Sequence, residues 1–329
     1  YNDNDYIFSS SNSYSAIFAN EIFFKFINGY LNKRKKIRSI LEIGSNDLYL
    51  LKKFYKIANK LTGIDPVIKK DKKYSKIKTI KKFFNNQSLE KIDDDNELII
   101  CGHTLEHVEK PEVFIKNVLT KANKNTKIFF QFPSSESLIN SGSYDQIHHQ
   151  HYNYFSINSI NEMIKRCGGK LIDFSYNNLH YGALMIFFSK KDSKIKSLKT
   201  VKKNNKFINI NTSYECFSNH LLSCKKIIFN ALKNNKKFYV VGAGLMLPLV
   251  NYHLGGLLNI ANGILDDDKR KIGKYFPGIN VKITSLKNTN LKDSICLVGP
   301  IASSITTRKL INILGEKQPD QIISPTISF

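Results

Sequence analysis

Short apolar runs alternate with longer segments of helical apolar spacing along the first half of the chain. Helices are predicted at 20–31, 48–58 and 111–122, and from the N-cap Ser156 to 168. Buried strands are predicted at 39–43, 61–64, 78–84, 97–101, 127–132, 171–176 and 183–189. Strands that alternate with helices are typical of a mostly parallel sheet covered on both faces. The last two strands are joined by a short link, so we expect them to form an antiparallel edge.

A second, smaller unit of strands and helices follows a lysine-rich stretch at 190–206. A helix is predicted at 215–234 and another after Ser303, with strands at 238–241, 259–265, 294–298 and 321–324. The expected fold class is therefore α/β, with a doubly wound sheet in the first lobe and a Rossmann-like second lobe. The inferred division is an N-terminal helical segment (1–38), a first lobe (39–190), a helical linker (191–236) and a C-terminal lobe (237–329).

The composition is that of a globular protein. Of the 329 residues, 42% are hydrophobic and 12% aromatic, which excludes a wholly disordered chain. No run approaches the ~20 apolar residues that a membrane span needs, and the first residues do not resemble a secretory signal. The five cysteines lack C-x-x-C spacing, which argues against a disulfide framework or a structural zinc site. A cytoplasmic location is the simplest interpretation.

Positive charge is in excess, with 50 Lys and Arg against 27 Asp and Glu, a formal net charge of +23. Such an excess can indicate an acidic partner, such as nucleic acid or a phosphorylated metabolite. However, nearly all of it comes from lysines spread along the chain, whereas proteins that read nucleic acid favour arginine. We interpret the charge mainly as compositional drift.

The turn after the first strand has the features of a cofactor site. In 41–47 (LEIGSND), Gly44 lets the backbone approach a ligand closely, just before a helix begins. Asp65 lies 21 residues after Gly44, at the end of the second strand, where a carboxylate can bind both hydroxyls of a ribose. A pyrophosphate site needs G-x-G-x-x-G, but this turn has one glycine and polar side chains. The pattern favours S-adenosylmethionine over NAD, with Glu42 either orienting the turn or holding the ammonium group.

Three stretches resemble the class I S-adenosylmethionine-dependent methyltransferases: 41–47 (LEIGSND), 63–66 (GIDP) and 103–108 (HTLEHV). The resemblance implies that 39–190 is a methyltransferase domain that binds this cofactor. The candidate cofactor-binding residues are Glu42, Gly44, Ser45, Asn46, Asp65, Pro66, His103 and Thr104.

Three further stretches resemble the nucleotide-sugar C-methyltransferases within that superfamily. Residues 144–156 (YDQIHHQHYNYFS) are similar to the family's D-x-I-Y-H-E-H-x-x-Y-F-S signature. Residues 180–182 (HYG) resemble its later His-Gly-Gly, and 271–278 (KIGKYFPG) the K-x-G-R-x-x-P-G stretch of its C-terminal lobe. The resemblance covers nearly the whole chain and implies a nucleotide-linked sugar as the substrate.

The chain also departs from the family pattern. Leu48 stands where the family has glycine, His148 where it has tyrosine, and Gln150 where it has glutamate. The family's cysteine-based N-terminal zinc lobe has no counterpart in these residues. Because Gln150 carries no negative charge, we expect a changed acceptor. A sugar hydroxyl methylated on oxygen is favoured, and C-methylation of a ketosugar is the alternative.

Histidines are expected to gather at the carboxyl edge of the sheet. His107 follows the fourth strand, and His148, His149 and His151 follow the fifth. A neutral imidazole can take a proton from a hydroxyl at pH 7. By resemblance His151 is the first candidate for this base and His107 the second, with His149 and Gln150 also in the catalytic set. No metal ion is expected, because the sequence shows neither a helical i,i+4 pair nor a nearby acidic ligand.

The candidate substrate-binding residues are Tyr6, His148, Tyr154, His180 and Lys274. In the second lobe, the Gly-Ala-Gly turn at 242–244 and Asp266 form a weak nucleotide-binding pattern, because Leu247 replaces the third glycine. One interpretation is a second nucleotide site, such as one for NAD. The other, implied by the resemblance and favoured, is a lobe that helps to enclose the nucleotide sugar.

The sequence therefore predicts an S-adenosylmethionine-dependent methyltransferase of a nucleotide-linked sugar, in polysaccharide (such as capsule) or secondary-metabolite biosynthesis. An RNA methyltransferase or RNA-binding module is the alternative, supported mainly by charge. A binding protein that has kept the cofactor pocket but lost its base is a third hypothesis. The expected partner is the nucleotide sugar, and assembly into a homo-oligomer stays open.

Overall fold

The computed structural model describes residues 11, 14–32, 35–68, 72–178, 180, 182–201, 209–244, 246–299 and 304–325. Two compact units divide the chain. The first comprises Tyr1–Glu136 and His149–Asn205, and the second comprises Ser137–His148 and Lys206–Phe329. None of the described helices is long and apolar enough to cross a membrane.

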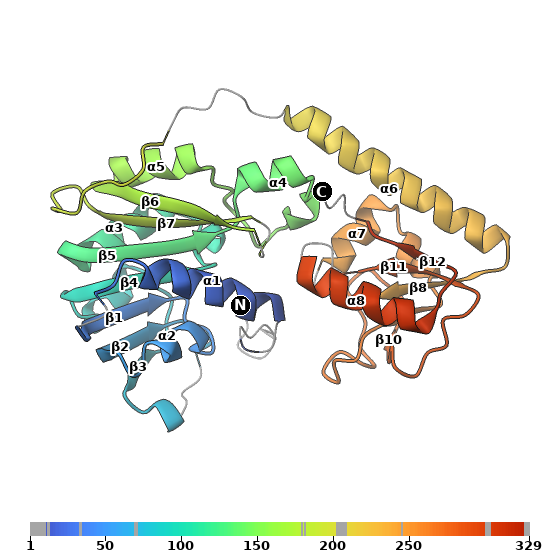
Figure 1. Cartoon of the computed structure of the whole chain (residues 1–329), viewed down its shortest axis with the longest axis horizontal. Helices are drawn as coiled ribbons and strands as arrows, with labels where there is room; N and C mark the ends of the chain where they lie inside the picture. Colours follow the sequence, from blue (N-terminus) through green and yellow to red (C-terminus); the bar gives the residue numbers. More distant parts are fainter. Residues whose placement is uncertain are drawn as a thin grey trace. The chain divides into compact units, whose positions relative to one another are not determined.

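A seven-stranded sheet forms the first unit (Figure 1). Its strands are β1 (Ile37–Ile43), β2 (Ala58–Ile64), β3 (Ile77–Ile80), β4 (Asn96–Gly102), β5 (Ala122–Phe132), β6 (Gly169–Asn177) and β7 (Ala183–Lys190). They lie in the order β3-β2-β1-β4-β5-β7-β6, and β1 to β5 are parallel. Strand β7 runs antiparallel to both β5 and β6. The predicted doubly wound α/β sheet with an antiparallel edge is confirmed.

Helices cover both faces of this sheet because successive strand residues point to opposite sides. Phe129 of β5 packs in the core with α1 (Tyr14–Asn28) and α2 (Tyr49–Lys53). Its neighbour Phe130 packs in the other core, with α3 (Pro111–Thr120) and α5 (Ile157–Arg166). These two apolar cores lie on opposite faces of the sheet. Figure 1 shows helices on both sides of it.

Local signals set where these helices begin. Pro111 occupies the first turn of α3, where its missing N–H is not needed. Ser156 caps α5 as predicted, and its side-chain oxygen accepts a hydrogen bond from the Ser159 N–H at 3.0 Å. The described residues of the first unit also form the 3-10 helices η2 (Lys72–Tyr74), η3 (Asn86–Lys91) and η4 (Leu105–His107).

The second unit is built on a smaller parallel sheet. Its strands β8 (Lys237–Val241), β9 (Gly263–Leu265), β10 (Ile283–Thr284), β11 (Ser294–Val298) and β12 (Gln321–Ile323) lie in the order β10-β9-β8-β11-β12. All of the pairs are parallel, which confirms the Rossmann-like second lobe. Its other elements are η5 (Tyr144–Gln146), α6 (Ile210–Lys233), α7 (Leu247–His253), η6 (Leu257–Ile260) and α8 (Ser304–Lys317). Helix α4 (Ser135–Ser141) begins in the first unit and ends in the second.

Some predicted element boundaries are wrong. Helix α2 ends at Lys53 instead of 58, because a turn at 54–57 leads directly into β2. The strand predicted at 259–265 comprises only Gly263–Leu265, because Leu257–Ile260 form the 3-10 helix η6. Apolar periodicity cannot separate a buried 3-10 turn from a strand start over so few residues. The domain boundaries inferred at 38, 190 and 236 stay a prediction.

The strand order places a crevice between β1 and β4. Here the sheet reverses its winding, and the turns that follow both strands diverge at their carboxyl ends. Residues 44–48 follow β1, and 103–108 follow β4. Open α/β sheets bind ligands at such a switch point, so these turns are the first place to look for a site.

Candidate functional site

The turns after β1 and β4 approach each other so closely that one residue must lack a side chain. Gly44 has φ of +73°, and a Cβ built on it would lie 1.9 Å from the Thr104 Oγ1. Any other residue there would push the two turns apart and strain the backbone. The glycine singled out in the sequence therefore holds the crevice in its shape.

Leu48 occupies the position where the resembling family has glycine. Its φ is +65°, in the left-handed region that favours glycine, and it directly precedes α2. Its side chain is buried in the core beneath the turn. The backbone shape is thus kept without the usual residue, and packing of the leucine offsets the strain.

A cavity of about 110 Å³ lies at the carboxyl end of β1 and β4. It is lined by Ala16, Ala19, Asn20, Glu42, Gly44, Ser45, Asn46, Tyr49, Leu50, Asp65, Gly102, His103, Thr104 and His180. The lining includes every predicted cofactor-binding residue except Pro66, which lies outside it. It also includes His180, which the sequence assigned to the substrate. Helix α1 forms one wall through Ala16, Ala19 and Asn20, and no sequence motif marked this wall.

Glu42 places a carboxyl group in the floor of this cavity. The residue is 5% exposed, and its Oε2 has no hydrogen-bond partner among the described residues. Burial, together with the negative charges of Asp47 and Asp65, raises its pKa well above the usual value. A group that is held neutral in this way would be ionised again by a positive ligand.

Asp65 closes the end of β2 and binds the backbone of both adjacent turns. Its Oδ2 accepts a hydrogen bond from the Asn46 N–H at 3.0 Å, and its Oδ1 accepts one from the Val67 N–H at 2.8 Å. Burial raises its pKa, although these two hydrogen bonds act in the opposite direction. Each oxygen keeps a second lone pair that can receive a donor from a ligand.

A chain of buried amides orients His103 in the cavity wall. The Asn177 amide NH2 donates to the Gln131 Oε1 at 3.1 Å and to the Ala19 carbonyl at 3.2 Å. The Gln131 NH2 therefore faces the His103 Nε2, at 2.9 Å, and that nitrogen accepts. The other ring nitrogen, Nδ1, then donates to the Glu106 Oε1 at 3.2 Å. The network fixes one tautomer of His103.

His103 and His180 lie next to each other, with ring centroids 4.7 Å apart. Burial of the His180 ring, together with the neighbouring His103 imidazole, holds the pKa of His180 well below its usual value. His180 is therefore neutral at pH 7, and it can contribute a polar but uncharged wall to the cavity.

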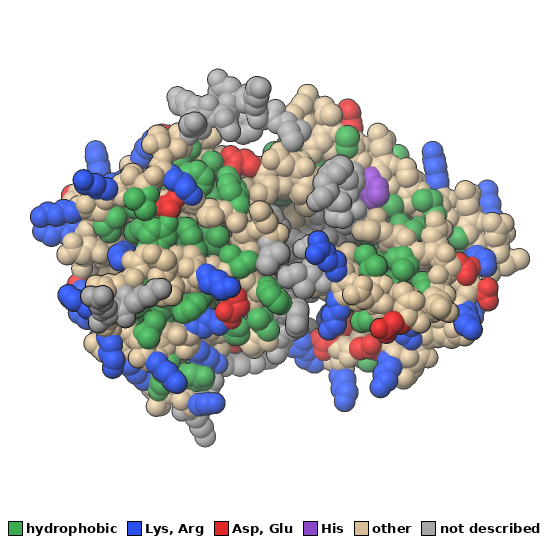
Figure 2. Space-filling view, in the orientation of Figure 1, with side chains coloured by type: hydrophobic (Ala, Val, Ile, Leu, Met, Phe, Trp, Pro, Cys, Tyr) green, Lys and Arg blue, Asp and Glu red, His purple; other side chains and the backbone are tan. Residues whose placement is uncertain are grey.

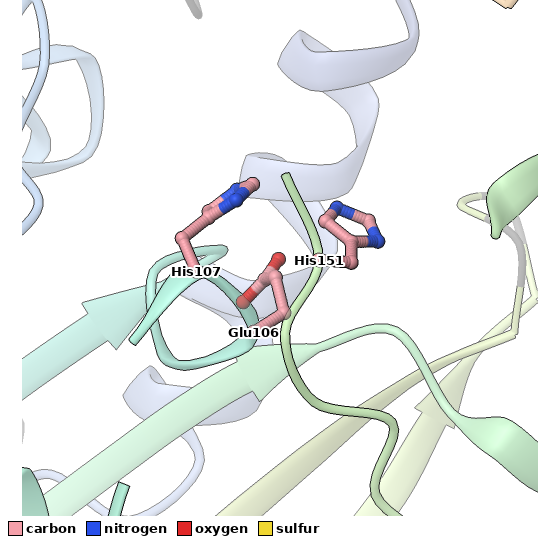
Figure 3. A group of neighbouring side chains, drawn as sticks. All are labelled: Glu106, His107 and His151. Carbon is pink, nitrogen blue, oxygen red and sulfur yellow. The ribbon is translucent and has the colours of Figure 1, made fainter. Parts of the chain in front are cut away.

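A second group of side chains lies beside the turn after β4 (Figure 3). Glu106 and His107 belong to this turn, and His151 comes from the segment that passes it. The rings of His107 and His151 lie 4.9 Å apart, and in Figure 3 the Glu106 carboxylate points between them. The expectation that the two histidine segments lie side by side is confirmed.

Hydrogen bonds orient the groups of this cluster. The His107 Nδ1 lies 2.8 Å from the Gln150 carbonyl, which can only accept, so Nδ1 carries the proton and Nε2 keeps a lone pair. Burial raises the pKa of Glu106, but the hydrogen bond from His103 and the proximity of the imidazoles of His103, His107 and His151 outweigh it. Its pKa lies below the usual value, and Glu106 is a carboxylate at pH 7.

The other predicted residues lie elsewhere or at the margin. The side chains of His149 and Gln150 are exposed, and Gln150 contributes its backbone carbonyl. The Tyr154 ring lies 6.0 Å from that of His151. His148 and Lys274 belong to the second unit, and Tyr6 lies outside the described residues.

Glu106, Gln131 and Asn177 are the polar residues of this region that the sequence analysis missed. Glu106 lies within the HTLEHV motif, three residues after His103, and this spacing brings the two side chains together in a turn. Glu106 also corrects the argument that no acidic ligand lies near the histidines. Gln131 and Asn177 carried no local signal, since only sheet pairing through β5, β7 and β6 brings them together.

In the second unit, the weak nucleotide pattern is filled by its own side chains. The Asp266 Oδ2 accepts a hydrogen bond from the Ala243 N–H at 2.8 Å. The Lys271 ammonium binds the same oxygen at 3.0 Å and the Ala243 carbonyl at 3.0 Å. A Cβ on Gly299 would lie 2.1 Å from the Gly242 carbonyl oxygen, so the adjoining turns are also closely packed. These contacts disfavour a dinucleotide here.

Replacement of Glu42 by glutamine should change stability in a pH-dependent way. Folding raises the pKa of Glu42, so the unfolded chain loses this proton at a lower pH than the folded protein does. The free energy of unfolding therefore falls as pH rises from the pKa of the unfolded state to that of the folded state. Glu42→Gln cannot ionise, so its stability relative to the parent should be greater at pH 8 than at pH 5. Urea unfolding midpoints of both proteins at the two pH values measure this, and an equal difference at both would contradict it.

No curated protein matches this chain in sequence. Solved structures similar to it include a 1,6-didemethyltoxoflavin-N1-methyltransferase of Burkholderia thailandensis bound to S-adenosylhomocysteine (11% identity, 53% of this chain and 77% of that one, TM-score 0.39). Another is a Listeria monocytogenes protein described as a methyltransferase dependent on S-adenosylmethionine (10% identity, 53% of this chain and 99% of that one, TM-score 0.41). A third is the magnesium protoporphyrin IX methyltransferase of Synechocystis PCC 6803 (8% identity, 54% of this chain and 85% of that one, TM-score 0.42). At these TM-scores the likenesses carry no argument about chemistry.

The family model for a methyltransferase domain matches residues 16–173. That range contains the whole of the turn after β1, the turn after β4 and the histidine segment. The expectation of a methyltransferase is confirmed at this level, since residues 16–173 are similar to a methyltransferase domain.

Proposed function

We propose that the chain is an S-adenosylmethionine-dependent methyltransferase that methylates a hydroxyl of a nucleotide-linked sugar. The observation that carries the proposal is the cavity at the carboxyl end of β1 and β4, with the cluster of Glu106, His107 and His151 joined to it through His103. The similarity to a methyltransferase domain gives the reaction class. The cavity and the cluster supply a place for the donor and a base for the acceptor.

The donor fits the groups that line the cavity. The buried Oε2 of Glu42 and the Oγ of Ser45 have no hydrogen-bond partner among the described residues, so polar atoms of a ligand can satisfy them. Asp65 would receive the ribose hydroxyls, and Glu42 would face the positive charge of the methionine part. When bound, S-adenosylmethionine supplies a methyl group activated by its sulfonium.

His151 removes the proton of the acceptor. The acceptor oxygen forms a bond to the methyl carbon as the carbon–sulfur bond breaks, and the hydroxyl proton passes to the imidazole. A positioned base of this kind contributes roughly 10²–10⁴-fold to a rate. The Glu106 carboxylate lies in the same group of side chains and stabilises the imidazolium that results.

The acceptor class rests on the motifs at 144–156, 180–182 and 271–278, which resemble those of nucleotide-sugar methyltransferases. Gln150 replaces the acid of that family, and its exposed amide can orient a sugar but cannot take a proton. This favours oxygen as the methylated atom. C-methylation of a ketosugar is the second candidate, because the same imidazole could remove a proton beside a carbonyl.

An RNA substrate is less well supported. On the face drawn in Figure 2, Lys and Arg side chains are scattered and acidic side chains lie among them, so no continuous basic stripe is seen there. Proteins that bind nucleic acid usually gather their positive charge along one face or groove.

Mass spectrometry of a panel of nucleotide sugars incubated with the protein and S-adenosylmethionine tests the proposal. A gain of one methylene mass on one member, with the methyl group assigned to oxygen by NMR, is the expected result. A methyl group on carbon would support the second candidate. Methylation of RNA but of no nucleotide sugar would contradict both.

Removal of the charge of Asp65 should weaken donor binding. Asp65→Asn loses the ionised acceptor for the ribose hydroxyls, which is expected to lower the affinity for S-adenosylmethionine roughly 10- to 100-fold, or about 1.5–3 kcal/mol. Calorimetric titration of the parent and variant measures the change. Thermal melting of both verifies that the variant is folded, and an unaltered affinity in a folded variant would exclude Asp65 from the site.

His151→Ala should separate chemistry from donor binding. His151 does not line the cavity, so the affinity for S-adenosylmethionine should stay close to that of the parent. Turnover should fall ~10²-fold or more, because the acceptor loses its base. Single-turnover rates at saturating donor measure this step. Equal rates in the two proteins would refute the role of His151.

A further inference from the structure

The cluster of Glu106, His107 and His151 has the composition of a metal site. Each residue offers one ligand atom, and these three atoms lie within 4.8 Å of one another. Two imidazoles and one carboxylate are a common three-residue ligand set for zinc and for other first-row transition metals. Such sets leave further positions open for water or a substrate.

Glu106 brings a buried, unsatisfied carboxylate oxygen to this group of residues. The residue is 2% exposed, and its Oε1 accepts the hydrogen bond from His103. Its Oε2 is buried and has no partner among the described residues. A buried carboxylate oxygen is unfavourable without a partner, and a cation is the partner that a carboxylate binds most strongly.

His107 is prepared to be a ligand. Its Nδ1–H donates to the Gln150 carbonyl, which orients the ring and leaves the Nε2 lone pair available. Metal-binding histidines usually make such a bond with their second nitrogen, because it fixes the tautomer and raises the basicity of the first.

The backbone holds the segment of His151 against the turn after β4. The N–H groups of Tyr152 and Asn153 donate to the Glu106 carbonyl at 2.8 and 3.2 Å, and the Asn153 amide donates to the Val108 carbonyl at 2.6 Å. The two chain segments are thus fixed before any ion binds. Ligands at tetrahedral angles with bonds of about 2.1 Å lie about 3.4 Å apart, so small side-chain rotations would close the site.

We propose that Glu106, His107 and His151 bind a divalent transition-metal ion. The two nitrogen ligands select such ions over magnesium, which prefers oxygen ligands. A bound ion lowers the pKa of a coordinated oxygen and would favour deprotonation of a hydroxyl next to the cavity. That consequence rests on the proposed function, and His107 and His151 are then ligands instead of bases. Binding of the ion does not depend on the proposed function.

Titration of the chelator-treated full chain with Co²⁺, in the absence of methyl donor and acceptor, tests the site. The expected result is one equivalent bound, with visible absorption bands, and displacement by Zn²⁺ but not by equal Mg²⁺. His107→Ala and His151→Ala should each lower the Co²⁺ affinity at least ~100-fold, beyond the roughly 10–100-fold loss typical when a residue that orients a ligand is removed. Glu106→Gln should do the same.

His149→Ala is the matched control, because it removes an exposed imidazole two residues from His151 and outside the cluster. It should bind Co²⁺ as the parent does. Circular dichroism verifies folding, and the two histidine variants decide the matter if the buried Glu106→Gln does not fold. The absence of Co²⁺ binding, or equal affinity in the parent and both histidine variants, would overturn the proposal. Failure to methylate any sugar would contradict the proposed function and leave this result unchanged.

Discussion

The close approach of Gly44 to Thr104 is the contact on which the site depends. It sets the distance between the turns after β1 and β4, at the point where the sheet reverses its winding. No side chain fits at residue 44, and the left-handed φ there is one that glycine adopts readily. Gly44 and Thr104 both line the cavity, so a side chain at residue 44 would disturb its wall.

Three buried carboxylates, those of Glu42, Asp65 and Glu106, belong to this region, and their hydrogen-bond partners differ. Glu42 lacks a partner for one oxygen, and burial raises its pKa. Asp65 is satisfied by two backbone N–H groups, and Glu106 is kept ionised by histidines. A buried carboxylate oxygen without a partner lowers stability, so the oxygens of Glu42 and Glu106 that lack a partner among the described residues are typical of a site that a polar ligand completes.

The sequence was informative where chemistry and turn geometry fall within a few residues. Gly44, Asp65 and the HTLEHV motif placed the crevice correctly, because a β-strand followed by a glycine turn leaves few alternatives. The capping serine of α5 was likewise a local signal. Each of these inferences needed no knowledge of long-range packing.

Long-range contacts could not be inferred in the same way. Gln131 of β5 and Asn177 of β6 are hydrogen-bonded in a sheet whose strand order is β5-β7-β6, and no local sequence pattern predicts that order. The wall formed by α1 was missed because no sequence motif marked it. Glu106 is a chemically active residue, but it was not singled out because its role depends on contacts with His107 and His151 that only the folded chain makes.

Glu106 joins the two halves of the site. Its Oε1 accepts a hydrogen bond from the Nδ1–H of His103, a residue of the cavity wall whose backbone has φ of +50°. Its Oε2 is buried without a hydrogen-bond partner among the described residues, and the carboxylate points between His107 and His151 in Figure 3. A change in the charge near either oxygen alters the strength with which the other binds its partner, because one carboxylate shares its negative charge between them. The cavity and the histidine cluster are therefore coupled electrostatically through a single buried side chain.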